Sequence, residues 1–275
     1  MYLGRHTCLS WLRDEAGLDS IPLLREIGGA PPFVIAAGDR RRVARVLSRL
    51  DDSIDLAEHC RASLREAATG RVALGIGRTG GVPVLAVETQ MGGPATEIVL
   101  REVLDPIFHP EGARTVLRVG TCGALGGAPL AIASFASGWS GAAEQSRRGV
   151  LGPPVEFESG RPPRPPQLPC SSNVVAALKA VAPDAAIGGV FSKDSLYAEQ
   201  DEGFVGLLRD LGCVATEMEL ATIGAVAESL GVAWGGIMAT AGCLEGEAWH
   251  DAEAVERNEL RAIDAALAAI RSLAD

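Results

Sequence analysis

The sequence predicts an α/β fold built on a buried sheet, and three observations carry that prediction. Several short apolar runs are continuous and do not alternate with polar residues, as strands covered on both faces require. Amphipathic helical patterns separate these runs, and such alternation is typical of α/β proteins. The chain has 275 residues, of which 47% are hydrophobic, enough for a large core. No linker divides it near the middle, so we expect a single domain over residues 1–275.

The expected strands are the apolar runs. The first of them is followed at once by glycine and charged residues, which predicts a loop at its carboxyl end. The others share its brevity and its continuous apolar character. In chain order they are Phe33–Ala37, Val84–Val87, Val116–Val119, Ile187–Phe191 and Val232–Met238.

The expected helices lie between or after these strands. Arg41–Leu50 places its apolar side chains on one face, and Pro94 suits the first position of a second helix. Glu217–Leu230 forms a third pattern, and Gly231 suits its end. The C-terminal stretch is amphipathic, with apolar residues at three- and four-residue steps: Leu260, Ile263, Leu267 and Ile270.

Charge and cysteine usage restrict the class of protein. The formal net charge is -10, and nucleic-acid binding needs clustered basic residues, so we expect no nucleic-acid partner. No run of about 18 apolar residues occurs, so we expect no membrane span. The N-terminus lacks the apolar core of a signal peptide. The six cysteines are scattered without a CxxC pair, which predicts reduced thiols and a cytoplasmic location.

Several familiar motifs are absent or misplaced. Gly75–Gly80 fits the dinucleotide fingerprint, but an apolar strand follows it instead of a helix, which predicts a hairpin turn. P-loop, HExxH and GxSxG patterns do not occur.

No histidine lies at metal spacing, so we expect no metal, and only His6 stays open as a site residue reaching a neighbouring subunit. The proline-rich residues 152–169 predict a surface loop.

Three glycine-containing segments, two of them with arginines, and one acidic segment form a set. Arginines among glycines and free backbone N–H groups suit a phosphate, whereas carboxylates suit sugar hydroxyls. The set therefore indicates a site that binds phosphate and ribose together. Its members are Gly38–Val43, Met91–Thr96, Arg118–Gly123 and Ala215–Glu219.

The order of these segments resembles the nucleoside phosphorylase family of the uridine phosphorylase type. The resemblance runs from about Phe33 to the C-terminus and is weak over residues 128–182. It implies a three-layer α/β/α sandwich around a mixed, twisted central sheet. It also implies a homodimer or a hexamer of three dimers, small-molecule nucleoside and phosphate partners, and no cofactor beyond inorganic phosphate as co-substrate.

The resemblance assigns a group of residues to phosphate. Gly38 permits close backbone approach, and Arg42 offers a planar fork of donors. Arg118 lies in an otherwise apolar strand, where a buried arginine needs a carboxylate or an anionic ligand, and we favour the ligand. Thr121 adds a hydroxyl and an N–H group. Arg65 resembles an arginine that the family supplies from the adjoining subunit.

The same resemblance assigns ribose and base contacts. Glu219 takes the ribose hydroxyls, with Glu217 and Met218 beside it, and Arg118, Glu219 and Arg42 carry the catalysis. The base faces four residues: Gln200, Glu202, Cys122 and Gly123.

The base side departs from the family pattern. Glu202 and Cys243 stand where uridine-type members carry arginines, which removes donors for the base carbonyls. Gln200 with Glu202 favours a base that presents N–H groups, such as a modified pyrimidine or a purine. The expected reaction is phosphorolysis of uridine or a related nucleoside to a free base and ribose 1-phosphate. Two alternatives stay open: a nucleoside hydrolase on the same fold, and a diverged, non-catalytic nucleoside-binding protein.

Overall fold

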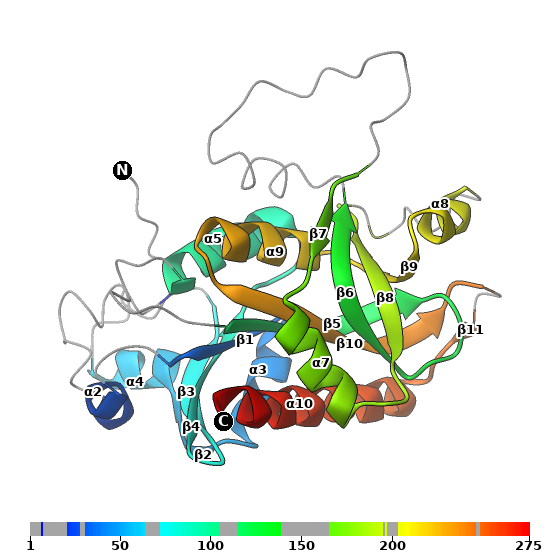
Figure 1. The fold of residues 1–275 in the computed structure, drawn as a ribbon. Helices are drawn as coiled ribbons and strands as arrows, with labels where there is room; N and C mark the ends of the chain where they lie inside the picture. The colour runs from blue at the N-terminus through cyan, green and yellow to red at the C-terminus, as the bar shows by residue number, and fades with distance from the viewer. Residues whose placement is uncertain are drawn as a thin grey trace.

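Helices lie on both faces of one mixed sheet in the computed structural model of the chain (Figure 1). The structure describes residues 7, 21–27, 31–63, 72–104, 115–138, 165–194, 196, 203–245 and 248–275. The predictions for His6, Arg65, Gln200 and Glu202 lie outside these residues, as does most of the proline-rich segment. Among the described residues, no helix combines the length and apolar character needed to cross a lipid bilayer.

The sheet contains eleven strands within the described residues. All five strands expected from the apolar runs are present, and the first has the expected bounds. The strands are β1 (Phe33–Ala37), β2 (Asp51–Asp55), β3 (Leu74–Thr79), β4 (Val82–Glu88), β5 (Thr115–Ala124), β6 (Leu130–Gly138), β7 (Gln167–Pro169), β8 (Ala186–Ser192), β9 (Cys213–Glu217), β10 (Ala233–Cys243) and β11 (Ala248–Trp249).

The helices occupy the connections between strands. Two of them begin at aspartates whose side chains cap the first turn: Asp39 Oδ1 accepts from Arg42 N at 2.9 Å, and Asp251 Oδ1 accepts from Ala254 N at 2.6 Å. The helices are α2 (Pro22–Ile27), α3 (Arg40–Leu47), α4 (Leu56–Ser63), α5 (Gly93–Leu104), α7 (Ser172–Val181), α8 (Phe204–Asp210), α9 (Leu220–Ser229) and α10 (Ala252–Ala274).

Part of the sheet closes on itself. β5 pairs in parallel with β10, β10 pairs antiparallel with β6, and β6 pairs in parallel with β8. β8 pairs in parallel with β9, which returns antiparallel to β5. These five strands form a ring, while β1, β4, β3 and β2 extend from β5 as an open wing.

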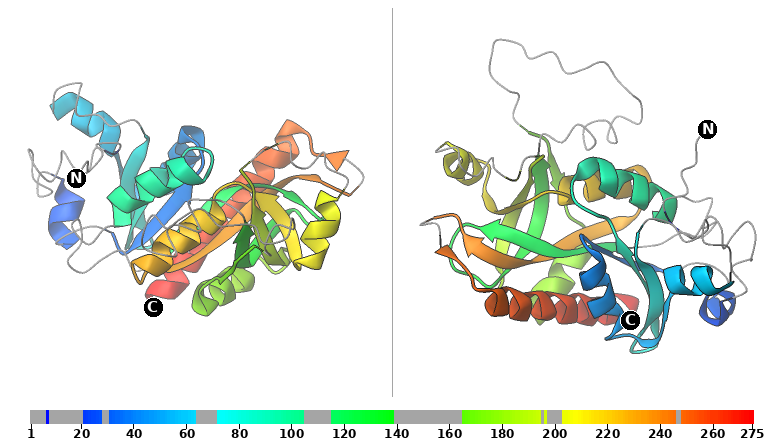
Figure 2. Two further views of the ribbon diagram at one scale, coloured as in Figure 1. Left: turned by 90° about the horizontal axis from the view of Figure 1, so that it is seen from above. Right: turned by 180° about the vertical axis from the view of Figure 1, so that it is seen from behind.

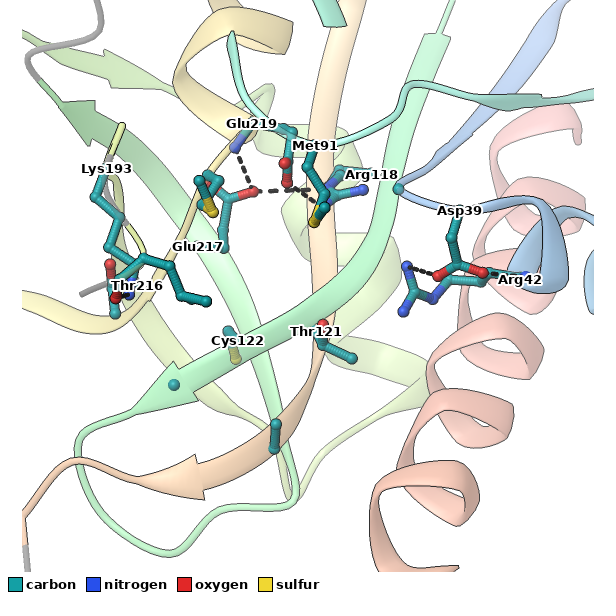
Figure 3. A pocket seen from close by; sticks show the side chains of 15 residues that line it. Asp39, Arg42, Met91, Arg118, Thr121, Cys122, Lys193, Thr216, Glu217 and Glu219 are labelled. Atoms are coloured by element: carbon teal, nitrogen blue, oxygen red, sulfur yellow. Dashed lines mark hydrogen bonds and ion pairs between the residues drawn. The ribbon is translucent and has the colours of Figure 1, made fainter. Parts of the chain in front are cut away.

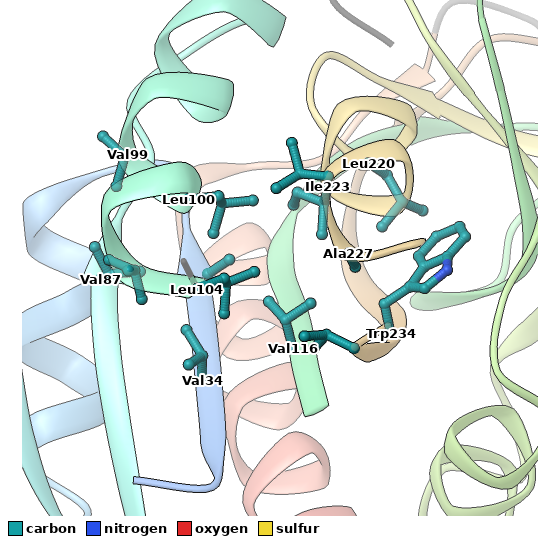
Figure 4. Packing of buried hydrophobic residues seen from close by; sticks show 14 of the residues in the cluster. Val34, Val87, Val99, Leu100, Leu104, Val116, Leu220, Ile223, Ala227 and Trp234 are labelled. Atoms are coloured by element: carbon teal, nitrogen blue, oxygen red, sulfur yellow. The ribbon is translucent and has the colours of Figure 1, made fainter. Parts of the chain in front are cut away.

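Two hydrophobic cores lie on opposite faces of the sheet. Val34 and Val116 point to the face covered by α5 and α9, which run side by side (Figures 2 and 4). Ile35 and Leu117, the next residue of each strand, point to the face covered by α3, α7 and α10. This period-two alternation lets one continuous apolar strand serve both cores.

The segment Gly75–Gly80 forms the predicted hairpin and not a nucleotide-binding loop. β3 and β4 pair antiparallel from Leu74 with Val87 to Thr79 with Val82. The turn between them falls on Gly80 and Gly81, with φ angles of +55° and +83°. Glycine is favoured there because the left-handed region carries no Cβ penalty for it.

Two sequence predictions need correction. Glu217 does not begin a helix, because β9 ends at Glu217 in register with Ser192 of β8 and the helix starts only at Leu220. The predicted loop over residues 152–169 is not a loop throughout, since Gln167–Pro169 pairs with β6 as β7. A short strand at the margin of the sheet tolerates the terminal proline, which cannot donate to a central ladder.

Candidate active site

A cavity of about 250 Å³ opens at the ends of β1 and β9 and along β5 (Figure 3). β1 and β5 are parallel, but β1 ends at Ala37 in register with Val119 while β5 continues to Ala124, so Gly38 follows β1 beside the middle of β5. The cavity brings together every predicted site residue that the structure describes. These are Gly38, Arg42, Arg118, Thr121, Cys122, Gly123, Glu217, Met218 and Glu219.

Two arginines converge on Gly38. A Cβ atom built on Gly38 would lie 3.3 Å from Arg118 Nη1 and 3.4 Å from Arg42 Nη1. Both guanidinium groups therefore border the same small space, although one comes from α3 and the other from β5. Both arginines are buried, so their charges act in surroundings of low dielectric constant, where an anion binds more strongly than in bulk water.

Two carboxylates hold the buried guanidinium of Arg118. Its Nη2 donates to Glu219 Oε2, and its Nε lies 3.5 Å from Glu217 Oε2. Its Nη1 has no hydrogen-bond partner within the described part of the chain. The guanidinium folds back over Gly120, where a Cβ atom would stand 2.8 Å from Arg118 Cζ.

Glu219 is fixed at both carboxylate oxygens. Oε2 accepts from Arg118, and Oε1 accepts from the backbone N–H of Gly92 at 2.7 Å. Gly92 belongs to the loop before α5, so the second and fourth segments of the sequence meet at this carboxylate. The side chain is buried but lines the cavity, where it is available to a ligand hydroxyl.

Glu217 has a different set of partners. Oε2 accepts from Glu219 N at 2.8 Å, Oε1 accepts from Leu220 N at 2.9 Å, and the Ser192 hydroxyl donates to Oε1. Burial raises the pKa of Glu217, with the nearby Glu219 carboxylate as a second cause, while Arg118 lowers it. Its bonds to backbone N–H groups make it the residue that shapes the turn between β9 and α9.

The cavity also contains residues that sequence reasoning did not assign. Lys193 follows β8 and is buried, and its Nζ donates to the Leu196 carbonyl at 3.2 Å. The same nitrogen stands 6.0 Å from the ring centroid of Phe204. The position of this lysine immediately after an apolar strand is the sequence signal that could have identified it as a site residue. The other unassigned lining residues are Asp39, Met91, Leu196, Thr216 and Ala241.

The described histidines lie outside the site, and no metal centre accompanies it among the described residues. His59 lies in α4 and His250 precedes α10, and neither lines this cavity. Within the described residues, no group of three or more His, Cys, Asp or Glu side chains has the arrangement of a metal site.

Known proteins resemble this chain over most of its length. The family model described as "Phosphorylase superfamily" matches residues 32–274. A guanosine phosphorylase from Halorubrum lacusprofundi is 29% identical over 222 residues, covering 81% of this chain and 83% of the relative. A uridine phosphorylase from Escherichia coli is 26% identical over 254 residues, covering 88% and 92%.

A solved structure has the same fold. The purine nucleoside phosphorylase from Toxoplasma gondii, in complex with immucillin-H, superimposes with a TM-score of 0.67 at 20% sequence identity. The match covers 90% of this chain and 92% of that one. The observed mixed sheet and its helices thus agree with an α/β fold of the nucleoside phosphorylase kind.

Proposed function

Because this chain belongs to the phosphorylase superfamily, we propose that it cleaves a ribonucleoside by phosphorolysis, releasing a free base and ribose 1-phosphate. The observation that supports this most directly is the convergence of Arg42 and Arg118 on Gly38 in the cavity that also holds Glu219. Two cations suit a phosphate dianion, and a buried carboxylate suits vicinal hydroxyls. The enzyme class is a pentosyltransferase that uses inorganic phosphate as co-substrate and needs no other cofactor.

In the proposed reaction, Arg42, Arg118 and Thr121 hold phosphate below C1′ of the ribose. A phosphate oxygen forms the new bond to C1′ while the glycosidic C–N bond breaks. The electron pair of the C–N bond moves to the base nitrogen. Positive charge develops on the sugar, where the neighbouring phosphate stabilises it. No covalent intermediate with the protein is required.

Glu219 is the proposed ribose residue. It lines the cavity and accepts from Arg118 and from the Gly92 N–H group, whereas Glu217 uses its oxygens to hold the start of α9. Met218 lies between them and lines the same cavity. We therefore assign the hydroxyl contacts to Glu219 and a supporting role to Glu217.

The base sits beside Cys122, Gly123 and Lys193 in this proposal. An ammonium group has only donors, so Lys193 favours a base that presents a carbonyl oxygen. Uracil and guanine both do so, and the relatives described above are named for uridine and guanosine. Gln200 and Glu202 complete the base side by resemblance to the family.

The remaining features of the proposal concern organisation and location. We infer a three-layer sandwich formed by one domain over residues 1–275, and a homodimer or hexamer in which Arg65 enters the adjoining subunit's site. A reducing, cytoplasmic location is part of the proposal, and four free cysteines in the described part of the chain agree with it. These are Cys122, Cys170, Cys213 and Cys243.

The test is release of free base from uridine, guanosine, cytidine and adenosine, with and without inorganic phosphate. Phosphate-dependent release together with ribose 1-phosphate is the expected result. Release that needs no phosphate would identify a hydrolase instead. Measurable nucleoside binding without release in either condition would identify a non-catalytic binding protein.

A further inference from the structure

Arg42 has a second carboxylate partner that lies outside the cavity lining. Its Nη2 donates to Glu259 Oε1, and 217 residues separate the two in the chain. On the cavity side, Arg42 Nη1 lies 3.1 Å from Asp39 Oδ2, and Nε has no hydrogen-bond partner within the described residues. Glu259 of α10 therefore holds Nη2 of the guanidinium, while Nη1 lies on the cavity side beside Asp39.

Glu259 is buried deep between two helices. It is 3% exposed, and a carboxylate in such surroundings is costly unless it is paired and hydrogen-bonded. Both oxygens are paired, because Oε2 accepts from Arg45 of α3 while Oε1 accepts from Arg42. Arg45 in turn donates to Glu256, whose side chain is 53% exposed. The network thus runs from solvent through α10 to the arginine of the cavity.

The ion pair between Glu259 and Arg42 determines where the Arg42 side chain points. A flexible arginine at the edge of a cavity loses rotamer freedom when it binds an anion, and a partner that fixes it beforehand reduces that loss. Glu259 engages Nη2, whereas Nη1 points to the space above Gly38 that Arg118 Nη1 also borders. Glu259 thereby aims Arg42 at the point where the two arginines converge.

We propose that Glu259 is a positioning residue, which preorganises Arg42 for phosphate through the pair between α10 and α3. The inference rests on the proposed phosphorolysis, because it concerns the affinity for that co-substrate. Glu259 touches no substrate itself. A purely structural link between the two helices would affect stability without a selective effect on phosphate.

The experiment compares Glu259→Gln with wild type and with Glu256→Gln, which changes the exposed end of the same network. KM for phosphate, KM for nucleoside, kcat and melting temperature are measured for each. We expect Glu259→Gln to raise KM for phosphate about ten-fold or more, because a hydrogen bond between charged groups is lost. KM for nucleoside and kcat should change by no more than about three-fold, and Glu256→Gln should resemble wild type, as exposed pairs contribute little.

Glu259→Asp keeps the charge with a shorter reach, so it should show a smaller rise in KM for phosphate. It also decides the matter if Glu259→Gln does not fold. An unchanged KM for phosphate in a folded Glu259→Gln variant would overturn the positioning role, as would an equal rise for both substrates; if that variant does not fold, either result in Glu259→Asp would overturn it. A wild-type enzyme that needs no phosphate would instead overturn the proposed function.

Discussion

Arg118 and Glu219 form a buried ion pair across the cavity, although they are 101 residues apart in the chain. The pair joins the first half of β5 to the residue that precedes α9 and places a cation beside an anion at one point (Figure 3). Because each charge neutralises the other, the cavity does not hold an isolated charge before ligands arrive. In the proposed reaction, the same two groups serve phosphate and ribose, so the two substrates are held in contact.

Replacement of Glu219 should affect ribose recognition. In Glu219→Gln the amide cannot accept two hydroxyl protons as a carboxylate does. We expect kcat/KM to fall about ten- to one-hundred-fold, since hydrogen bonds to charged groups contribute about 1.5–3 kcal/mol. Discrimination against a 2′-deoxynucleoside should also shrink. Steady-state kinetics on both nucleosides measure this.

The matched control for that experiment is Glu253→Gln on α10, where the side chain is 89% exposed. It should keep wild-type kinetics. A Glu219→Gln enzyme that still discriminates as well as wild type between ribose and 2′-deoxyribose would show that another group holds the 2′-hydroxyl.

Gly120→Ala should displace Arg118. The new methyl group would stand 2.8 Å from both Cζ and Nη2 of the guanidinium, which must then move. We expect KM for phosphate to rise by about ten-fold, the effect of losing one charged hydrogen bond. Gly127→Ala is the control, because no heavy atom lies within 4 Å of its Cβ position. Equal kinetics for the two variants would contradict the role of Arg118.

Lys193→Met should weaken the reaction on bases that present a carbonyl oxygen. It keeps the length of the side chain and removes the donors, so we expect kcat/KM for uridine or guanosine to fall about ten-fold or more. Lys193→Arg should restore part of the activity. Lys179→Met, at an exposed position of α7, serves as the control. Wild-type kinetics of Lys193→Met on the preferred nucleoside would rule out a contact with the base.

Cys170 should make stability fall at alkaline pH. Burial, with Glu228 as a second cause, raises the pKa of its thiol from 9.0 to about 12. The unfolded chain loses this proton near pH 9 while the folded chain keeps it, so the contribution is present below pH 9 and is lost as the pH rises from about 9 to 12. Urea unfolding midpoints across this range measure the fall, and Cys170→Ala should reduce its slope. A slope unchanged by the substitution would assign the effect to other groups.

The sequence predicted the parts of the fold that carry strong local signals. Phe33–Ala37 is apolar throughout, and it forms a strand with those bounds because both cores need its side chains. By contrast, Asp51–Asp55 is acidic and mostly exposed, so its pairing with β3 leaves no apolar pattern to read. β9 was missed because it is five residues long and ends in the polar Thr216 and Glu217.

The candidate site, like the fold, could be predicted only in part from the sequence. Segments that combine glycine and arginine identified Gly38, Arg42 and Arg118, since their chemistry is local to each segment. The partnership of Arg42 with Glu259 depends on how α10 packs on α3, and no spacing within either helix encodes it. The assignments of Arg65, Gln200 and Glu202 remain predictions.

The ring of five strands has a consequence for how the chain folds. β10 is the last of these strands along the chain, yet it inserts between β5 and β6 and pairs with residues more than a hundred positions earlier. Such long-range pairing is slow to form, and until it forms, two apolar strand edges are open to other chains. The yield of folded protein should therefore depend on the protein concentration and the temperature during folding, before β10 has paired. This holds even if the folded protein is stable.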